Sequence, residues 1–435
     1  MKTVITTLFL VLFVSATYAV PKTACRVTKT TDSNDGSCDA GDCSLREAIA
    51  NTACPTVDFS FDLVGQRIYL LSDIVIDRTV SIKGYGADAI TIAAGNMTRL
   101  FYIAPGGNAT ISGVTMTDGK GNGTGPSGGG AIRNAGGQLT LDGVYLTGNV
   151  SQGGGALAGN ATIRNSTISR NWSGPDMDGA ILSGFTLNLY NVTITDNTGA
   201  GIFTQGFPEV VNSTIANNSG PGLAMDSAAI FMASNSIVRD IYQFDQWSSV
   251  ISFGNNIFSN APGTMRPVIA SSTDLVGVDP MLGPFSYYGG HVPTLPLLAG
   301  SPSIDRGDNQ LAINAGLTAD QRGYQRFVDG DGNGTATVDI GAYEFNAAPV
   351  STVSVSGRVL GAVSGNPLRS VTVVLTELDG TRHTTLSSSL GWYNFQGLPS
   401  GFVYTVVVAA RRGSIQKTVF ADQNVTDGDI LVPGL

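Results

Sequence analysis

An acidic, glycine-rich segment near residue 330 has the spacing of a calcium-binding loop. It reads Asp329-Gly-Asp-Gly-Asn-Gly334, so that Asp329, Asp331 and Asn333 offer side-chain oxygens at positions 1, 3 and 5. Such oxygens, with a glycine at the sharp turn, suit Ca²⁺. The usual closing Glu at position 12 is missing, and Asp339 stands at position 11 instead. A shortened calcium loop and a plain Asp/Gly turn without metal therefore both stay open. No other cofactor is expected.

A second acidic pair, Asp176 and Asp178, could take part in cleaving a polysaccharide. Hydrolysis of a glycosidic bond needs two carboxyl groups that face one cleft. Elimination needs a base such as Lys or Arg, and Arg133, Arg164 and Arg170 are the nearest cations. Solvated Asp residues in a turn explain the same pair, because Asp is common in turns. Asp176 and Asp178 are thus only weak catalytic candidates.

Other catalytic patterns are missing from the sequence. The chain has two His residues, His291 and His383, and neither stands in a Gly-His-Gly, His-Glu-X-X-His or Ser–His–Asp arrangement. Net charge is −9, so nucleic acid is not an expected partner. These features favour a protein without catalytic activity. The alternative is a polysaccharide lyase or a glycoside hydrolase.

Four cysteines lie close together near the start of the chain: Cys25, Cys38, Cys43 and Cys54. An even, clustered set in an exported chain indicates two disulfides. Three pairings exist, of which we favour Cys38 with Cys43 and Cys25 with Cys54. A zinc site is the alternative, although no His lies nearby.

The elements that must position these residues come from a repeated phrase of two short alternating segments around a small turn residue. The clearest copies are Ala109–Gly119, Leu139–Asn149, Ala161–Asn171 and Leu187–Asn197. The turn residues are Gly113, Gly143, Asn165, Asn191, Asn212 and Asn235. A period of roughly 20–30 residues indicates a solenoid, and alternation of apolar and polar residues indicates that it is built from strands.

A second set of apolar positions supplies a third strand in each coil. These positions are Ile132, Leu157, Ile181, Ile202 and Leu223. Three strands per coil predict an all-β, right-handed parallel β-helix. Asn149, Asn171, Asn197 and Asn218 end four successive phrases, and we expect them to hydrogen-bond along a column of stacked turns.

The start of the chain predicts export and a cap on the solenoid. Residues 1–19 have the pattern of a signal peptide, with Lys2, an apolar run and a small-residue cleavage site. Ser44-Leu-Arg-Glu47 is a capping box that begins a short helix, which we expect to cover the open end of the coils. No later apolar run is long enough for a membrane span.

Two motifs resemble known families of exported proteins. Cys43-Ser-Leu-Arg-Glu-Ala-Ile49 resembles the motif that names the CSLREA domain of exported bacterial β-helix proteins with a pectin-lyase-like fold. Ser301–Asp308 and Val338–Glu344 resemble the choice-of-anchor segment that closes such helices. The resemblance implies fold and location, and it supplies no catalytic residues.

The last part of the chain differs from the repeat. Short strands separated by Gly, Pro and Asn turns predict a small β-sandwich. Gly357-Arg-Val with Ser389–Pro399 resembles the carboxypeptidase regulatory-like (transthyretin-type) domain, which is not itself catalytic. The predicted organisation is a signal peptide (1–19), a disulfide-bearing cap (20–56), β-helix coils (57–300), a closing segment (301–345), a linker (346–352) and a β-sandwich (353–435).

The leading functional hypothesis is a secreted or cell-surface protein that is a monomer and is not catalytic. Its β-helix would present a polar surface to a polysaccharide or cell-surface glycan, and the sandwich would be an accessory module. A structural spacer that displays the sandwich is a third reading, beside the lyase or glycosidase. The regular repeat positions have structural duties, so function is expected at irregular ones.

Overall fold

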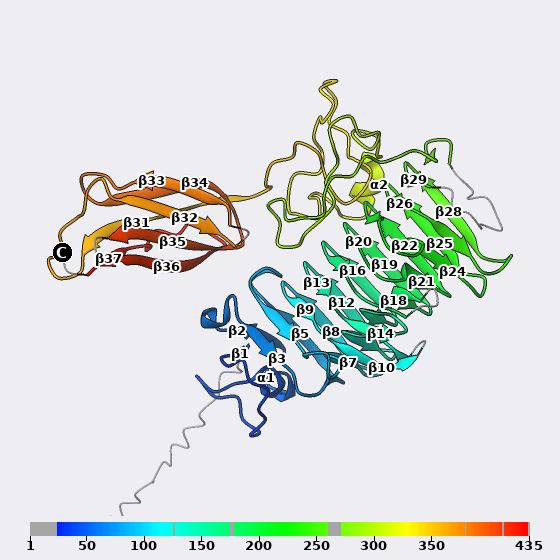
Figure 1. The fold of residues 1–435 in the computed structure, drawn as a ribbon, viewed down its shortest axis with the longest axis horizontal. Helices are drawn as coiled ribbons and strands as arrows, with labels where there is room; N and C mark the ends of the chain where they lie inside the picture. The colour runs from blue at the N-terminus through cyan, green and yellow to red at the C-terminus, as the bar shows by residue number, and fades with distance from the viewer. Residues whose placement is uncertain are drawn as a thin grey trace, which may run out of the picture.

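The computed structural model describes residues 24–124, 127–174, 178–259, 271–378, 380–410 and 413–433. The predicted signal peptide and Asp176 lie outside the described residues. Three long parallel sheets run side by side along a column of coils, and a separate sandwich follows (Figure 1). The structure therefore confirms the all-β parallel β-helix that the repeat predicted and the β-sandwich that the last part of the chain predicted.

A complete coil contributes one strand to each of three sheets, here called sheets I, II and III. Sheet I consists of β1 (Cys25–Val27), β2 (Thr56–Phe59), β5 (Thr79–Lys83), β8 (Asn108–Ser112), β12 (Gln138–Asp142), β16 (Ala161–Arg164), β19 (Thr186–Tyr190), β22 (Phe207–Val211), β25 (Ile230–Ser234) and β28 (Ser249–Gly254). Sheet II consists of β4 (Ile74–Ile76), β7 (Phe101–Ile103), β11 (Ile132–Asn134), β15 (Leu157–Ala158), β18 (Gly179–Ser183), β21 (Ala200–Thr204), β24 (Leu223–Met225) and β27 (Ile241–Gln243).

Sheet III completes the coils. Its strands are β3 (Arg67–Tyr69), β6 (Thr91–Ala93), β9 (Thr115–Thr117), β13 (Tyr145–Thr147), β17 (Thr167–Ser169), β20 (Thr193–Thr195), β23 (Thr214–Ile215), β26 (Ile237–Val238), β29 (Ile257–Phe258) and β30 (Leu275–Val276). A small extra sheet pairs β10 (Lys120–Thr124) with β14 (Val150–Gln152).

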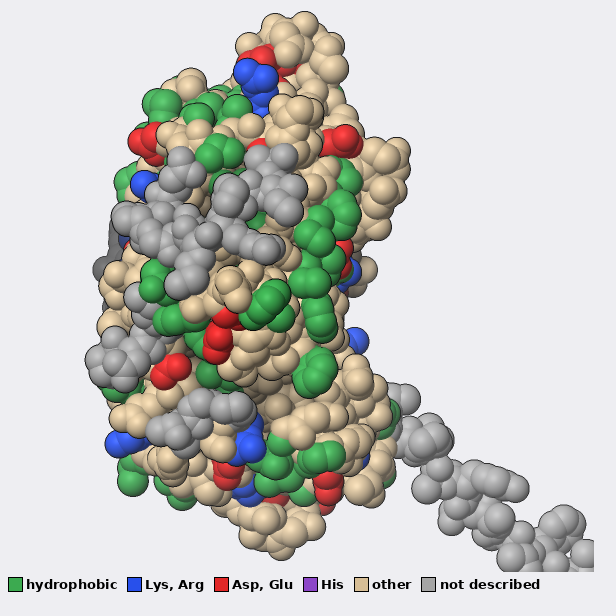
Figure 2. Space-filling view, turned by 90° about the vertical axis from the view of Figure 1, so that its right-hand side faces the viewer, with side chains coloured by type: hydrophobic (Ala, Val, Ile, Leu, Met, Phe, Trp, Pro, Cys, Tyr) green, Lys and Arg blue, Asp and Glu red, His purple; other side chains and the backbone are tan. Residues whose placement is uncertain are grey.

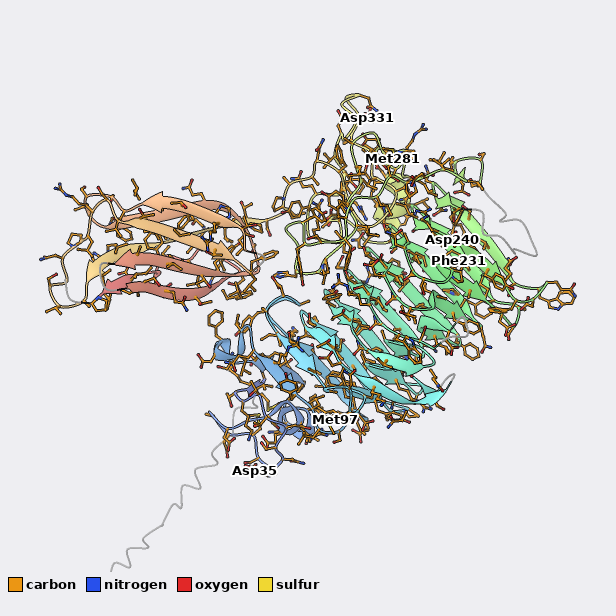
Figure 3. All side chains as sticks on the ribbon, in the orientation of Figure 1. Asp35, Met97, Phe231, Asp240, Met281 and Asp331 are labelled. Atoms are coloured by element: carbon orange, nitrogen blue, oxygen red, sulfur yellow. A yellow bond between two sulfur atoms is a disulfide. The ribbon has the colours of Figure 1, made fainter. Side chains whose placement is uncertain are left out.

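The core of the coils is a set of apolar columns. Ile132, Leu157 and Ile181 are direct partners on successive strands of sheet II, and each is fully buried. Phe231 points into this interior from β25 (Figure 3). No single coil could bury these side chains, so stacking of coils is what stabilises each one.

Asparagine occupies two columns of turns for two physical reasons. Asn165 and Asn191, between sheets I and III, have positive φ, a conformation that Asn tolerates better than most residues. In the second column, Nδ2 of Asn149 donates to Oδ1 of Asn171 at 3.0 Å, and Asn171 donates to Asn197 at the same distance. The predicted ladder is therefore present, and it satisfies buried backbone carbonyls as well.

The N-terminal end of the column is closed by a short helix, α1 (Leu45–Ala50). Ser44 and Glu47 form the predicted capping box, since Glu47 N–H donates to Ser44 Oγ and Ser44 N–H donates to Glu47 Oε2. Two disulfides join Cys25 to Cys54 and Cys38 to Cys43, which is the pairing that the sequence analysis favoured. A 3₁₀ turn, η1 (Phe61–Leu63), follows.

A long irregular segment, residues 281–345, folds back over sheet III, and we call it the strap. It contains one short helix, α2 (Asn309–Asn314), capped by Asp308. Outward threonines of sheet III hold it: Thr167 Oγ1 donates to the carbonyl of Pro293 at 2.5 Å, and Thr193 Oγ1 lies 2.8 Å from Thr294 Oγ1. The strap thus covers the middle of sheet III, while β3 stays exposed, and the strap also packs on Tyr190 and Val211 of sheet I.

The sandwich has two sheets and a core of its own. Its strands are β31 (Thr352–Gly361), β32 (Thr372–Glu377), β33 (Arg382–Leu386), β34 (Trp392–Pro399), β35 (Phe402–Ala410), β36 (Gly413–Ala421) and β37 (Ile430–Val432). No helix in the described part of the chain has the length and apolar character that crossing a bilayer requires.

Candidate functional site

Two neighbouring clefts lie at the corner where sheet II strands turn into sheet I strands, and we call them the corner clefts. The first, of about 260 Å³, is lined by Arg133, Asn134, Ala135, Gly159, Asn160, Leu182 and Gly184. The second, of about 220 Å³, is lined by Gly137, Gln138, Leu139, Asn160, Ala161, Thr162, Thr186 and Asn188. Because Asn160 belongs to both, the two clefts form one continuous surface around it.

The corner clefts offer hydrogen-bonding groups that the fold does not use. The side chains of Gln138, Thr162 and Asn188 make no hydrogen bond to another residue in the described part of the chain. Asn160 is fixed, because its Oδ1 accepts from the backbone N–H groups of Phe185 and Thr186 at 3.2 Å each. Fixed amides and free hydroxyls of this kind can bind the hydroxyl groups of a sugar.

Exposed aromatic rings stand next to these polar groups. Phe185 and Phe207 are 67% and 49% exposed, and the N–H of Phe207 donates to the carbonyl of Phe185 at 2.6 Å across adjacent coils. Large exposed apolar side chains are unfavourable in water, so a gathering of them marks an interaction surface. Two exposed aromatic rings therefore stand beside the polar groups of the corner clefts.

More aromatic residues follow sheet II. Arg133 lies over the ring of Tyr102 at 5.6 Å, and Phe244 contacts Phe203 and Tyr242, with ring centroids 5.9 and 4.8 Å apart. Figure 2 looks at the side of the column that is on the right in Figure 1, and hydrophobic side chains gather beside the grey atoms in the middle of this face. Rings at the corner and along sheet II together suit a chain of sugar rings better than a compact ligand.

Of the two weak catalytic candidates, the structure describes Asp178, whereas Asp176 lies outside the described residues. Asp178 precedes β18, and its backbone carbonyl accepts from Ser173 Oγ and from the N–H of Ala200. The arginines that an elimination would need lie on different sheets: Arg133 in β11 of sheet II, and Arg164 in β16 of sheet I. Arg170 follows β17 of sheet III, and it lies 5.6 Å from the ring of Phe285 in the strap.

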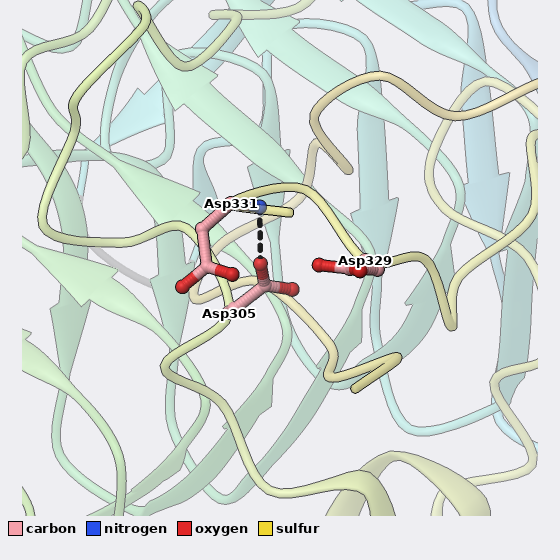
Figure 4. Close-up of side chains that lie close together, drawn as sticks. All are labelled: Asp305, Asp329 and Asp331. Carbon is pink, nitrogen blue, oxygen red and sulfur yellow. Dashed lines mark hydrogen bonds between the residues drawn. The ribbon is translucent and has the colours of Figure 1, made fainter. Parts of the chain in front are cut away.

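The acidic loop of the strap gathers three carboxylates, Asp305, Asp329 and Asp331, with oxygens within 4.8 Å of one another (Figure 4). Asp305 Oδ2 accepts from the N–H of Asp331 at 2.6 Å, and Asp305 Oδ1 is buried without a hydrogen-bond partner. Burial, and after it the neighbouring carboxylates, raises the pKa of Asp305. These oxygens fit a Ca²⁺ ion, which would supply the missing partner.

The plain-turn alternative also has support from the same loop. Asp329 Oδ1 accepts from the N–H groups of Gly332 and Asn333, and Oδ2 accepts from Gly334 N–H at 2.8 Å. Asn333 donates to Asp331 Oδ2 at 3.0 Å. Because these bonds organise the turn without a metal, calcium binding stays a prediction. Asp331 lies at the outer end of the strap, away from the coils (Figure 3).

Asp339 adjoins Asp305 but is not a member of this cluster of carboxylate oxygens. It is almost fully buried, and its two oxygens accept from the N–H groups of Asp305 and Phe345 at 2.7 and 2.6 Å. Nearby, the fully buried Arg326 lies 3.4 Å from Glu344. Burial raises the pKa of Asp339 to about 7 and that of Glu344 to about 9. The structure therefore places Asp339 in a buried network within the strap. The third carboxylate of the acidic cluster, beside Asp329 and Asp331, is that of Asp305.

Comparisons with known families agree with this architecture. Residues 99–263 match a family model described as a right handed beta helix region, and residues 354–430 match one described as a carboxypeptidase regulatory-like domain. No curated protein matches the chain. The chain is therefore a right-handed parallel β-helix joined to a carboxypeptidase regulatory-like β-sandwich.

Sequence reasoning missed several of these residues. Asp305 is 24 residues from Asp329 and carries no local spacing signal, so only the fold of the strap reveals it. Phe185 lies in the turn before β19 and Phe207 is the first residue of β22, and the repeat does not constrain the residue type at either position. The strand register pairs Phe207 with Thr186, so the two rings are offset by one position in consecutive coils.

Proposed function

We propose that the chain is an exported, non-catalytic protein whose β-helix binds a polysaccharide at the corner clefts. The observation that carries this proposal is the combination of exposed Phe185 and Phe207 with the free polar side chains of Gln138, Thr162 and Asn188. Aromatic faces stack on the apolar faces of sugar rings, while amides and hydroxyls select among their hydroxyl groups. The sandwich is an accessory module for binding or attachment.

Export is supported by the two disulfides, because disulfides persist in oxidising compartments. The signal-peptide pattern and the resemblance of residues 43–49 to the CSLREA motif point the same way. We further propose that the strap corresponds to the choice-of-anchor segment of exported bacterial β-helix proteins. The protein would then act outside the cell or at its surface.

Glycan binding is tested with residues 20–435, purified with both disulfides formed, on an array of plant, fungal and bacterial polysaccharides. Binding of the protein to at least one polysaccharide supports the proposal, and no binding to any polysaccharide on the array contradicts it. The bound polysaccharide is then incubated with the protein and Ca²⁺. New reducing ends or unsaturated products would show a lyase or glycosidase instead, and the non-catalytic part of the proposal would be wrong.

A further inference from the structure

A larger cleft, which we call the junction cleft, lies where the coils, the strap and the sandwich meet. Its volume is about 430 Å³. The coils contribute turns at Gly84–Gly86, Gly113, Gly143 and Asn165; the strap contributes His291 and residues 319–324; the sandwich contributes residues 399–402 and Phe420. Pockets of 300–1,000 Å³ are the usual size for small ligands. The junction cleft shares no lining residue with the corner clefts.

The floor of the junction cleft exists because two coils have glycine where later coils have asparagine. Further along the same column of turns, Asn191 and Asn235 donate to the strap carbonyls of Ala319 and Asp308. Gly113 and Gly143 have no side chain to fill this space. Gly143 has a φ of +59°, and a Cβ added there would meet no atom within 4 Å. The floor at Gly143 is therefore open.

The walls are aromatic and come from both domains. The ring of His291 stacks on Phe402 at 3.7 Å with an interplanar angle of 14°, and Phe420 lies 4.9 Å from Tyr85. His291 Nδ1 is 2.7 Å from Asp88 Oδ1, which leaves Nε2 as the ring nitrogen for another partner. The contact of His291 with Asp88 requires glycine at position 86, because a Cβ atom at this position would lie 2.3 Å from His291 Nδ1.

The charges around the junction cleft disfavour an anion. Arg322 is the one Lys or Arg among its described lining residues, and its side chain is 4% exposed. Its guanidinium already donates to Asp320 and to the carbonyl of Glu344. Asp142, in contrast, is half-buried at the floor and offers a carboxylate that accepts from Asn165 at 2.8 Å. Hydroxyl donors suit this lining, and carboxylate or phosphate groups do not.

We propose that the junction cleft is a second binding site, which takes a neutral saccharide of one or two rings. An apolar ring face lies against the half-buried Phe420, and hydroxyl groups donate to Asp142 and to backbone carbonyls of the glycine turns. Because the walls belong to both domains, an occupied cleft holds the sandwich against the coils. This site does not depend on binding at the corner clefts.

The test uses the full chain, residues 20–435, and measures binding of maltose, cellobiose, N,N′-diacetylchitobiose and digalacturonate by isothermal titration calorimetry. At least one neutral disaccharide is expected to bind, and digalacturonate is not. Gly143→Asn should weaken binding at least tenfold, because asparagine tolerates this backbone conformation, as Asn165 and Asn191 show, and fills the floor. The matched control is Gly95→Asn, at φ +57° with no atom within 4 Å, outside the cleft; it should bind as the parent does.

A second variant tests the same site in case Gly143→Asn weakens binding only by perturbing the turn. Asp142→Asn preserves volume and should weaken binding about fivefold, because hydrogen bonds to a charged acceptor are stronger than those to a neutral one. A Phe185→Ala/Phe207→Ala variant should bind the disaccharide normally, which separates this site from the corner clefts. Absence of binding by every neutral disaccharide, unchanged binding in both cleft variants, or a preference for digalacturonate would overturn the proposal.

Discussion

At the scale of single residues, buried polar groups decide much of the stability of this protein. Asn171 is fully buried, donates to two backbone carbonyls and to Asn197, and accepts from the N–H of Asn149. The buried backbone and side-chain groups that bond to Asn171 would lose this partner if its amide were removed. Buried polar groups without partners cost more than the hydrogen bond gains.

Asn171→Ala should therefore lower the free energy of unfolding by about 2–4 kcal/mol. Asn218, at the end of the same column and partly exposed, is the graded control, and Asn218→Ala should cost distinctly less. Urea unfolding followed by circular dichroism measures both. Equal losses at the two positions would show that the ladder does not stabilise the coils through its buried bonds.

The buried carboxyl groups of the strap predict a dependence of stability on pH. The raised pKa values mean that folded Asp339 and Glu344 hold protons that the unfolded chain releases near pH 4. Their stabilising effect is fully present below the unfolded pKa and is lost as pH rises through about 7 and about 9. Stability should fall from pH 5 to 9, by at most about 1.4 kcal/mol per pH unit for each group.

Glu344→Gln imitates the protonated carboxyl group, so its melting temperature should change less between pH 7 and 9 than that of the parent protein. Differential scanning calorimetry across this range provides the comparison. Parallel curves for the two proteins would mean that Glu344 does not titrate in this window. The buried contacts of Arg326 with Asn191 and Gly341 are retained in this variant.

At the scale of elements, the strap is the part that sequence reasoning described least well. The repeat, the capping box and the Asn ladder follow from local rules of alternation, capping and turn geometry, and each was predicted. That the strap returns over sheet III depends on Thr193, Thr294 and Gln321, which meet across about a hundred residues or more of sequence. Their side chains carry no local pattern that could reveal this contact.

Calcium should raise the melting temperature if the acidic loop binds it, because a ligand that binds only the folded state stabilises that state. Differential scanning fluorimetry with CaCl₂, and with MgCl₂ for comparison, measures this shift. Asp305→Asn should abolish most of it, since this residue supplies the oxygen without a partner. Asp62→Asn, at an exposed position far along the sequence, should leave the shift unchanged. A shift of the same size in Asp305→Asn would assign the calcium to another place.

At the scale of the whole molecule, the faces of the coils differ in what covers them and in which side chains they expose. The middle of sheet III is covered by the strap, while the corner between sheets I and II displays aromatic rings beside free amides and hydroxyls. The fold class could be predicted from the repeat because stacking imposes a period on the core. The corner clefts could not be predicted, because turns outside the core accept many residue types and the repeat does not constrain them.

The most direct test of the proposed function measures the affinity of the array-selected oligosaccharide by calorimetry for the parent protein, Phe185→Ala/Phe207→Ala and Phe253→Ala. Phe253 is a matched control, 56% exposed in β28, whereas Phe185 and Phe207 adjoin the cleft residues Asn160 and Thr186. Loss of one stacked ring costs about 1 kcal/mol or more, so the double variant should bind at least tenfold more weakly, while Phe253→Ala binds as the parent does. Equal affinity of all three proteins would contradict binding at the corner clefts.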